Sequence, residues 1–172
     1  GRIRVSPSLD YLERAYDAAK YGRFSKKPYL EIVVPTLHDA TLAPPGHHVL
    51  AVTAQYAPYN LREGDWDSRP AEFADVVLDT LEGVAPGTRS KVVHCQVVTP
   101  LDWERDYGLT EGSIHHGQMG LDQMLVMRPI PGYSRYETPI RNLYLCGAGA
   151  HPGGGVTGAP GYNAARAVLA AL

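Results

Sequence analysis

The sequence has little of what marks proteins that bind nucleic acids or cross membranes. Its 16 Lys and Arg are offset by 18 Asp and Glu, which gives a net charge of −2, and no basic run is longer than Lys26-Lys27. A chain without a basic patch is not expected to bind nucleic acid or an anionic membrane surface. No apolar stretch approaches the roughly 20 residues that a membrane-spanning helix needs.

Cysteine is also scarce. The two cysteines, Cys95 and Cys146, each lie within an apolar run. This pattern predicts small buried side chains in a reducing compartment rather than a disulfide or a redox pair. Residues 1–8, GRIRVSPS, contain no apolar segment of the kind found in secretory signals. Together these features predict a cytoplasmic protein.

Apolar residues are abundant enough to form a packed core, since hydrophobic residues make up 44% of the 172 residues and charged residues 20%. Apolar residues at helical spacing predict helices over residues 8–21 and 70–82, with Ser8 as the cap of the first. Thr99 followed by proline predicts the start of a further short helix, which Gly108 would end.

Apolar runs predict strands over residues 29–34, 48–56 and 91–98. The run 48–56 is apolar on both of its sides, so it is expected well inside the sheet. Residues 109–141 carry no periodic signal, which is unusual in a compact domain and often functional. The chain is then expected to form a strand over residues 142–147 and a helix from about residue 158 to the end.

The segment 143–161, LYLCGAGAHPGGGVTGAPG, is dense in glycine. A strand, a glycine turn and a helix can place unpaired N–H groups and a positive helix end against a ligand, and glycine permits close approach. The segment lacks the lysine of a phosphate-binding loop, and Pro152 stands where a dinucleotide fingerprint has its third glycine. From the pattern alone, a ligand site and a tight strand-to-helix crossover fit equally well.

Longer motifs carry a more specific signal. Residues 142–168, NLYLCGAGAHPGGGVTGAPGYNAARAV, resemble the C-terminal flavin-binding segment of the phytoene desaturase family of FAD-dependent oxidoreductases. Residues 99–108, TPLDWERDYG, and residues 112–149 also resemble segments of that family. The resemblance is specific over residues 99–172 and looser over residues 1–98, which are similar to the substrate-domain portion just upstream.

The resemblance implies an α/β fold that forms the C-terminal part of a two-domain FAD/NAD(P)-binding-type flavoprotein. Residues 1–108 would supply a mixed-sheet portion of the substrate domain, and residues 109–172 would supply the final strand, glycine turn and helix of the FAD domain. Family members begin with a βαβ unit that holds the ADP half of FAD, and this chain has no such unit. FAD binding and activity are therefore expected of the full-length protein rather than of this chain alone.

The resemblance also implies cofactor-binding residues in the glycine-rich segment. By motif position, Gly147, Ala148 and Gly149 would run along the ribityl–pyrophosphate region of FAD. The residues that would present N–H groups to the flavin ring are Gly155, Val156, Thr157 and Gly158. His151 would orient the loop rather than act as a base, because the flavin and not a side chain would carry the hydride.

The activity implied by the resemblance is flavin-mediated removal of a hydride from an apolar small molecule, in a dehydrogenation or an isomerisation. Met119, Met124 and Met127 fit either an apolar substrate cavity or ordinary core. The neighbours His115 and His116 point to opposite faces of an extended chain, so no metal site is expected. The alternative is a non-catalytic interaction or structural module that self-associates through an exposed apolar flavin face.

Overall fold

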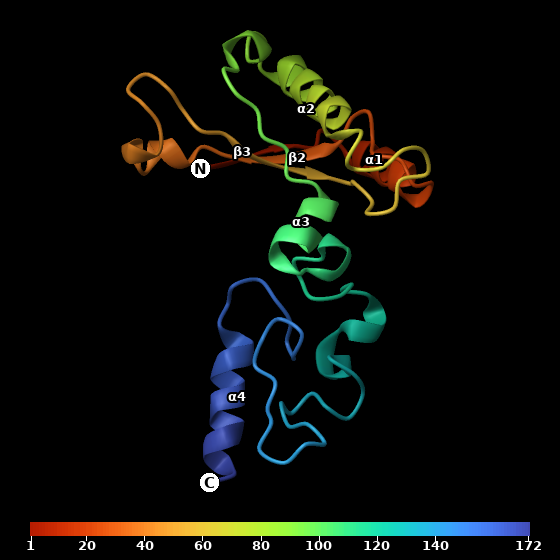
Figure 1. Ribbon diagram of the computed structural model, residues 1–172, viewed down its shortest axis with the longest axis vertical. Helices are drawn as coiled ribbons and strands as arrows, with labels where there is room; N and C mark the ends of the chain where they lie inside the picture. The colour runs from red at the N-terminus through yellow and green to blue at the C-terminus, as the bar shows by residue number, and fades with distance from the viewer. The chain divides into compact units, whose positions relative to one another are not determined.

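The computed structural model describes residues 1–172 and divides into two compact units, Gly1–Pro100 and Leu101–Leu172. The first unit contains a sheet and two long helices, and the second is largely irregular and ends in a helix (Figure 1). The assignment of residues 1–108 to a substrate domain and of residues 109–172 to an FAD domain stays a prediction. No helix is long and apolar enough to cross a membrane.

The sheet of the first unit has three strands, β1 (Arg2–Val5), β2 (Tyr29–Val33) and β3 (Ala51–Gln55), with β2 in the middle. The strands expected over residues 29–34 and 48–56 are confirmed with shorter bounds. Both pairings are antiparallel, so the expected mixed sheet is wrong for this chain. Strand β1 was not expected, because four residues are too few to show a period.

Two further expectations about strands in the first unit are wrong. Strand β3 lies at an edge of the sheet rather than well inside it, with Ala51, Thr53 and Gln55 exposed. Residues 91–98 form no strand, and Val93 is 82% exposed. An apolar run becomes a strand only where a partner strand pairs with it, and the run itself does not specify that partner.

The two long helices of the first unit follow the sequence closely. Helix α1 (Leu9–Lys20) begins after Ser8, whose Oγ accepts a hydrogen bond from the Tyr11 N–H at 3.1 Å. Helix α2 (Pro70–Val84) has its proline at the first position, where the missing N–H costs nothing. Both predictions are confirmed, because caps and helical periodicity act within a few residues.

Helix α2 covers one face of the sheet (Figure 1). The buried cluster there joins Val5 of β1, Leu30 and Ile32 of β2, and Leu81 of α2. Leu30 is fully buried at the centre of this cluster. A second group of rings packs Phe24, Trp66 and Phe73 together, with centroids 5.0 to 5.8 Å apart. These two groups form the core of the first unit.

A carboxylate holds the turn after α2. Glu82 accepts hydrogen bonds from the Arg89 N–H at 2.9 Å and the Gly87 N–H at 2.7 Å. These backbone donors, Arg89 first, lower the pKa of Glu82. Since charge-assisted hydrogen bonds favour the ionised carboxyl group, the turn depends on the charge of Glu82.

We expect Glu82→Gln to lower the free energy of unfolding near neutral pH and to have little effect in acid. A carboxyl group with a lowered folded-state pKa stabilises the fold above its ordinary pKa, which is 4.5, and this contribution is lost as the pH falls through the folded-state pKa. Urea unfolding at several pH values measures it. Glu13→Gln on the exposed face of α1 is the control, and an equal, pH-independent loss in both variants would contradict the role of Glu82.

In the second unit, helix α3 (Pro100–Tyr107) and helix α4 (Ala159–Ala170) are confirmed. Gly108, with φ +66°, ends α3, and its N–H donates to the Glu104 carbonyl at 2.9 Å. Residues 109–141 are irregular as expected, with only short 3-10 turns between α3 and the glycine-rich segment.

A strand predicted for this unit and the expected burial of both cysteines are wrong. Residues 142–147 form no strand, and only one isolated bridge, Glu137 with Tyr144, stands in its place. Cys95 in the first unit and Cys146 in the second are both exposed rather than buried. The expected burial required strands covered on both faces, and neither segment forms such a strand.

Candidate cofactor-binding site

The glycine-rich loop, residues 147–158, leads directly into α4 and is shaped by its own backbone turns. The Ala150 N–H donates to the Gly147 carbonyl at 3.0 Å, and the Gly153 N–H donates to the Ala150 carbonyl at 2.8 Å. Gly158 caps α4 in the left-handed region, with φ +71°. A side chain in that region is strained, so glycine is suited to the point where the loop enters the helix.

One side of the glycine-rich loop is uncovered. A Cβ atom added to Gly147, Gly149 or Gly158 would meet no atom within 4 Å. Val156 is fully exposed, although its side chain is apolar. The loop is therefore open on this side, and whether a ligand approaches its backbone there stays a prediction.

The start of α4 offers fewer hydrogen-bond donors than most helix starts. Pro160 has no N–H group, and the Ala159 N–H already donates to Oγ1 of Thr157 at 3.2 Å. The remaining N–H group of the first turn belongs to Gly161. The loop residues before the helix must therefore supply most of the donors to any ligand.

The other side of the loop is packed against a neighbouring loop, residues 115–128. A Cβ atom on Gly153 would lie 3.1 Å from Cε of Met119, and one on Gly154 would lie 3.3 Å from Nδ1 of His115. These two glycines are explained by close packing rather than by a ligand. His151 also links the two loops, because its Nδ1 lies within hydrogen-bond distance of the Leu125 carbonyl.

Arg128 ends the neighbouring loop, and its guanidinium lies between the two loops. Arg128 is 2% exposed, which no sequence pattern indicated. Its Nη2 donates to the carbonyls of His115 at 3.0 Å and His116 at 2.9 Å, and its Nη1 contacts Sδ of Met119. Its Nε has no hydrogen-bond partner. A buried arginine with an orphaned donor and no carboxylate partner is uncommon, since buried charges are normally paired.

Among the other candidates from the sequence, Met119 and His115 lie against this loop, but neither is part of an apolar cavity or a metal site. Met119, Met124 and Met127 are each more than a third exposed, so they neither form a core nor line a closed cavity in this chain. No three His, Cys, Asp or Glu side chains come together in a way that would hold a metal ion.

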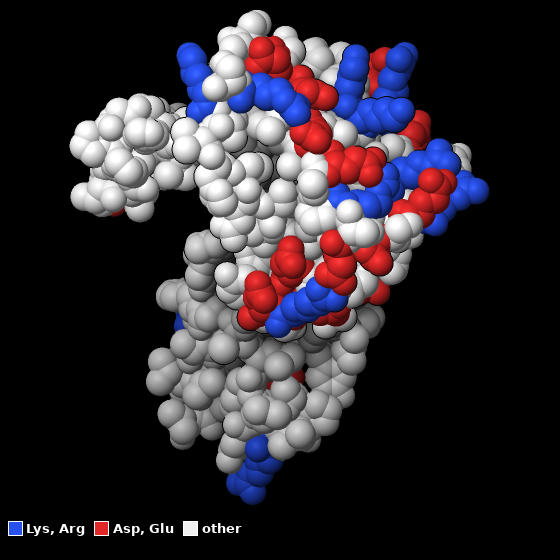
Figure 2. All heavy atoms as spheres, turned by 45° about the horizontal axis from the view of Figure 1, so that its top comes forward, with Lys and Arg blue, Asp and Glu red and all other residues white.

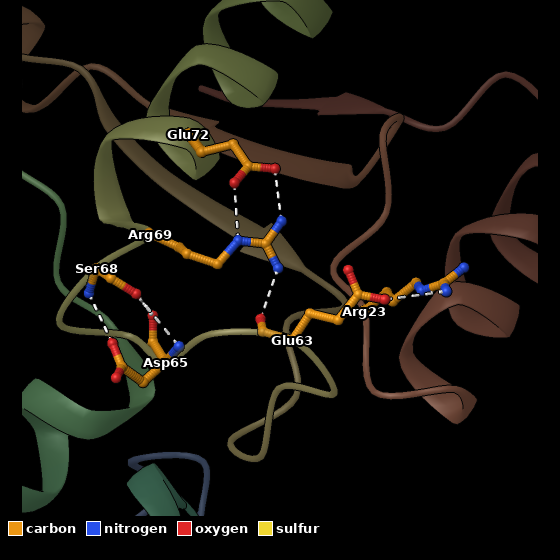
Figure 3. Close-up of polar contacts among 6 residues, drawn as sticks. All are labelled: Arg23, Glu63, Asp65, Ser68, Arg69 and Glu72. Atoms are coloured by element: carbon orange, nitrogen blue, oxygen red, sulfur yellow. Dashed lines mark hydrogen bonds and ion pairs between the residues drawn. The ribbon is translucent and has the colours of Figure 1, made fainter.

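A separate charged cluster lies in the first unit (Figure 3). The guanidinium of Arg69 donates to both carboxylate oxygens of Glu72, at 2.7 and 2.6 Å, and to the Glu63 carbonyl at 2.9 Å. The ion pair raises the pKa of Arg69 and lowers the pKa of Glu72. The guanidinium also lies 4.7 Å from the centre of the Phe24 ring. Because its charges are matched within the cluster, Arg69 fastens the start of α2 rather than offering a binding site.

Charge on the surface does not single out a further site. On the face shown in Figure 2, basic and acidic side chains are interleaved, with no large region of one sign. Charged side chains of the first unit also form ion pairs with one another, such as Arg89 with Asp75 and Asp79, and Lys20 with Asp17. The glycine-rich loop is thus the candidate site.

Known proteins are similar to this chain in sequence. Over 160 residues the chain is 47% identical to pyridine nucleotide-disulfide oxidoreductase domain-containing protein 2 of Rattus norvegicus. This match covers 92% of this chain and 28% of the relative. It is 31% identical over 161 residues to a phytoene desaturase (lycopene-forming) of a Paracoccus species, covering 91% of this chain and 31% of the relative. This chain belongs to the phytoene desaturase-like family.

A third relative, the phytoene desaturase (lycopene-forming) of Pantoea ananas, is 35% identical over 144 residues, covering 81% of this chain and 28% of the relative. The predicted resemblance is confirmed by these matches, which extend over most of the first unit as well as the second. No protein-family model matches the chain. The chain spans less than a third of the length of these phytoene desaturase-like relatives.

Proposed function

We propose that this chain is the C-terminal part of an FAD-dependent oxidoreductase and that its glycine-rich loop forms one wall of the flavin site. The observation that carries the proposal is the uncovered side of this loop, where Gly147, Gly149 and Gly158 leave open space beside the backbone. Membership of a family that includes phytoene desaturases adds the chemical class.

The residues of this loop fit the proposed cofactor. Gly147, Ala148 and Gly149 would lie along the ribityl–pyrophosphate part of FAD, and the uncovered backbone there leaves room for it. The flavin ring would be held by the backbone of Gly155, Val156, Thr157 and Gly158. Their N–H groups would supply most of the donors, since the start of α4 has few of its own.

The proposed reaction is removal of hydrogen from an apolar small molecule. Bound FAD supplies the hydride acceptor, so loss of a hydride from one carbon and of a proton from its neighbour leaves a double bond. Exposed apolar side chains in the second unit, Leu121, Leu125 and Val126, would contribute to excluding water from such a substrate. We also propose that the protein is cytoplasmic, on the basis of the sequence features described above.

The test is flavin uptake by the protein that contains this chain together with the remaining length found in its relatives. After incubation with FAD and removal of the free cofactor, the protein is expected to keep the visible absorption bands of bound flavin. Residues 1–172 alone, treated identically, are expected to stay colourless, because the ADP half of FAD has no site on them. A colourless longer protein contradicts the proposal.

A second candidate function is a non-catalytic module that self-associates. It is favoured by the apolar side chains left in water around the loop, chiefly Val156 and Leu125. Sedimentation of residues 1–172 then gives a mass above the 18.7 kDa monomer. A homogeneous monomer whose sedimentation is not changed by any added ligand would count against this function.

A further inference from the structure

Arg128 carries a charge that this unit does not neutralise. The side-chain carboxylates of the second unit, Leu101–Leu172, are Asp102, Glu104, Asp106, Glu111, Asp122 and Glu137. Arg128 is a partner in no ion pair with any of them. Its hydrogen bonds go to two backbone carbonyls, which carry partial charge only. A guanidinium buried in this way is costly unless an anion accompanies it.

Arg128 lies beside the glycine-rich loop, where the flavin is proposed to bind. The position of a Cβ atom on Gly153 would lie 3.4 Å from Nη1 of Arg128, so the guanidinium lies directly behind the glycine-rich loop. Carbonyls of residues 115 and 116 hold it from one side, and its Nε lacks an acceptor. A fixed cation without a competing carboxylate is preorganised to stabilise negative charge in the same loop.

We propose that Arg128 is the counter-charge for the flavin ring in its reduced, anionic form. This inference rests on the proposed function and adds a residue to that site. Reduction of bound flavin adds negative charge near the N1/O2 edge of the ring. A buried cation favours that form over the neutral oxidised form, so Arg128 raises the reduction potential of the cofactor.

The first experiment compares reduction potentials of bound FAD in the protein that contains this chain. Arg128→Gln removes the charge, and the reduced cofactor is expected to bind at least tenfold more weakly relative to the oxidised one. For a two-electron couple, a tenfold change lowers the potential by about 30 mV. Arg128→Lys keeps the charge and is expected to retain most of the potential. Arg141→Gln, an exposed arginine of the same unit, is the control.

The second experiment needs no variant. If Arg128 keeps reduced flavin anionic, one proton accompanies two electrons on the acid side of neutrality. The potential of the wild-type protein then falls by about 30 mV per pH unit, and it falls by about 60 mV if two protons are taken up. The steeper slope overturns the inference even where Arg128→Gln fails to fold.

The outcomes separate this inference from the proposed function. A protein that stays colourless with FAD overturns both. If bound flavin is present and Arg128→Gln leaves its potential unchanged, only the inference fails. Equal loss of oxidised and reduced flavin in that variant indicates that Arg128 holds the diphosphate or merely clamps the loop, and it overturns the assignment to the ring.

Discussion

Leu30→Ala is expected to lower the free energy of unfolding of the first unit by about 2–5 kcal/mol. Leu30 is fully buried in the middle strand, where it contacts the cluster formed by Val5, Ile32 and Leu81. Truncation removes apolar contacts and leaves a cavity, because the strands on both sides prevent the site from collapsing. Urea unfolding followed by circular dichroism measures the change.

The matched control is Ile3→Ala in the adjacent strand. Ile3 pairs with Ile32 across β1 and β2, but its side chain is 56% exposed. The same kind of truncation is therefore expected to cost less than about 1 kcal/mol, since little apolar area leaves the core. Similar losses in both variants would contradict a core centred between β2 and α2.

Gly158→Val is expected to weaken flavin retention by about tenfold or more, equivalent to at least about 1.4 kcal/mol of binding free energy. The valine side chain would occupy the open space next to the loop and would strain a backbone with φ +71°. Both effects move the backbone that is proposed to contact the ring. The measurement is the ratio of bound flavin to protein after gel filtration, over a range of FAD concentrations.

Gly108→Val controls for strain alone. Gly108 has φ +66°, also flanks a helix, and a Cβ atom on it would likewise meet nothing within 4 Å. Both variants are expected to lose roughly 1–2 kcal/mol of stability from the left-handed backbone. Only the variant in the glycine-rich loop should lose flavin, and an equal loss of flavin in both would mean that Gly158 acts through folding and not through contact.

The glycines of the loop and Arg128 show which parts of the candidate site could be predicted from the sequence. The glycine-rich turn and the helix that follows it were predicted where the structure has them, although the strand expected before them does not form. The side at Gly147 and Gly149 is open, and the binding of a ligand there stays a prediction. The pattern did not distinguish these glycines from Gly153, which packs against a neighbouring loop instead. The burial of Arg128 could not be predicted, because a single arginine in an apolar run gives the same sequence pattern whether its side chain is exposed or buried.

The sequence by itself determined the helices and the family. Ser8 caps α1, Pro70 opens α2 and Gly108 ends α3, because each acts through backbone hydrogen bonds within one helical turn. The family followed from the glycine-rich motif, which needs no knowledge of packing.

Only the tertiary structure decided which apolar runs became strands and which side chains were covered. Residues 91–98 and 142–147 had the composition of strands, yet neither became one, whereas β1 formed by pairing with β2. A strand is stabilised by hydrogen bonds to a distant segment, so its partner must be present before the run can be assigned. The burial of Arg128 is of the same kind, since it depends on two loops that meet only in the folded unit.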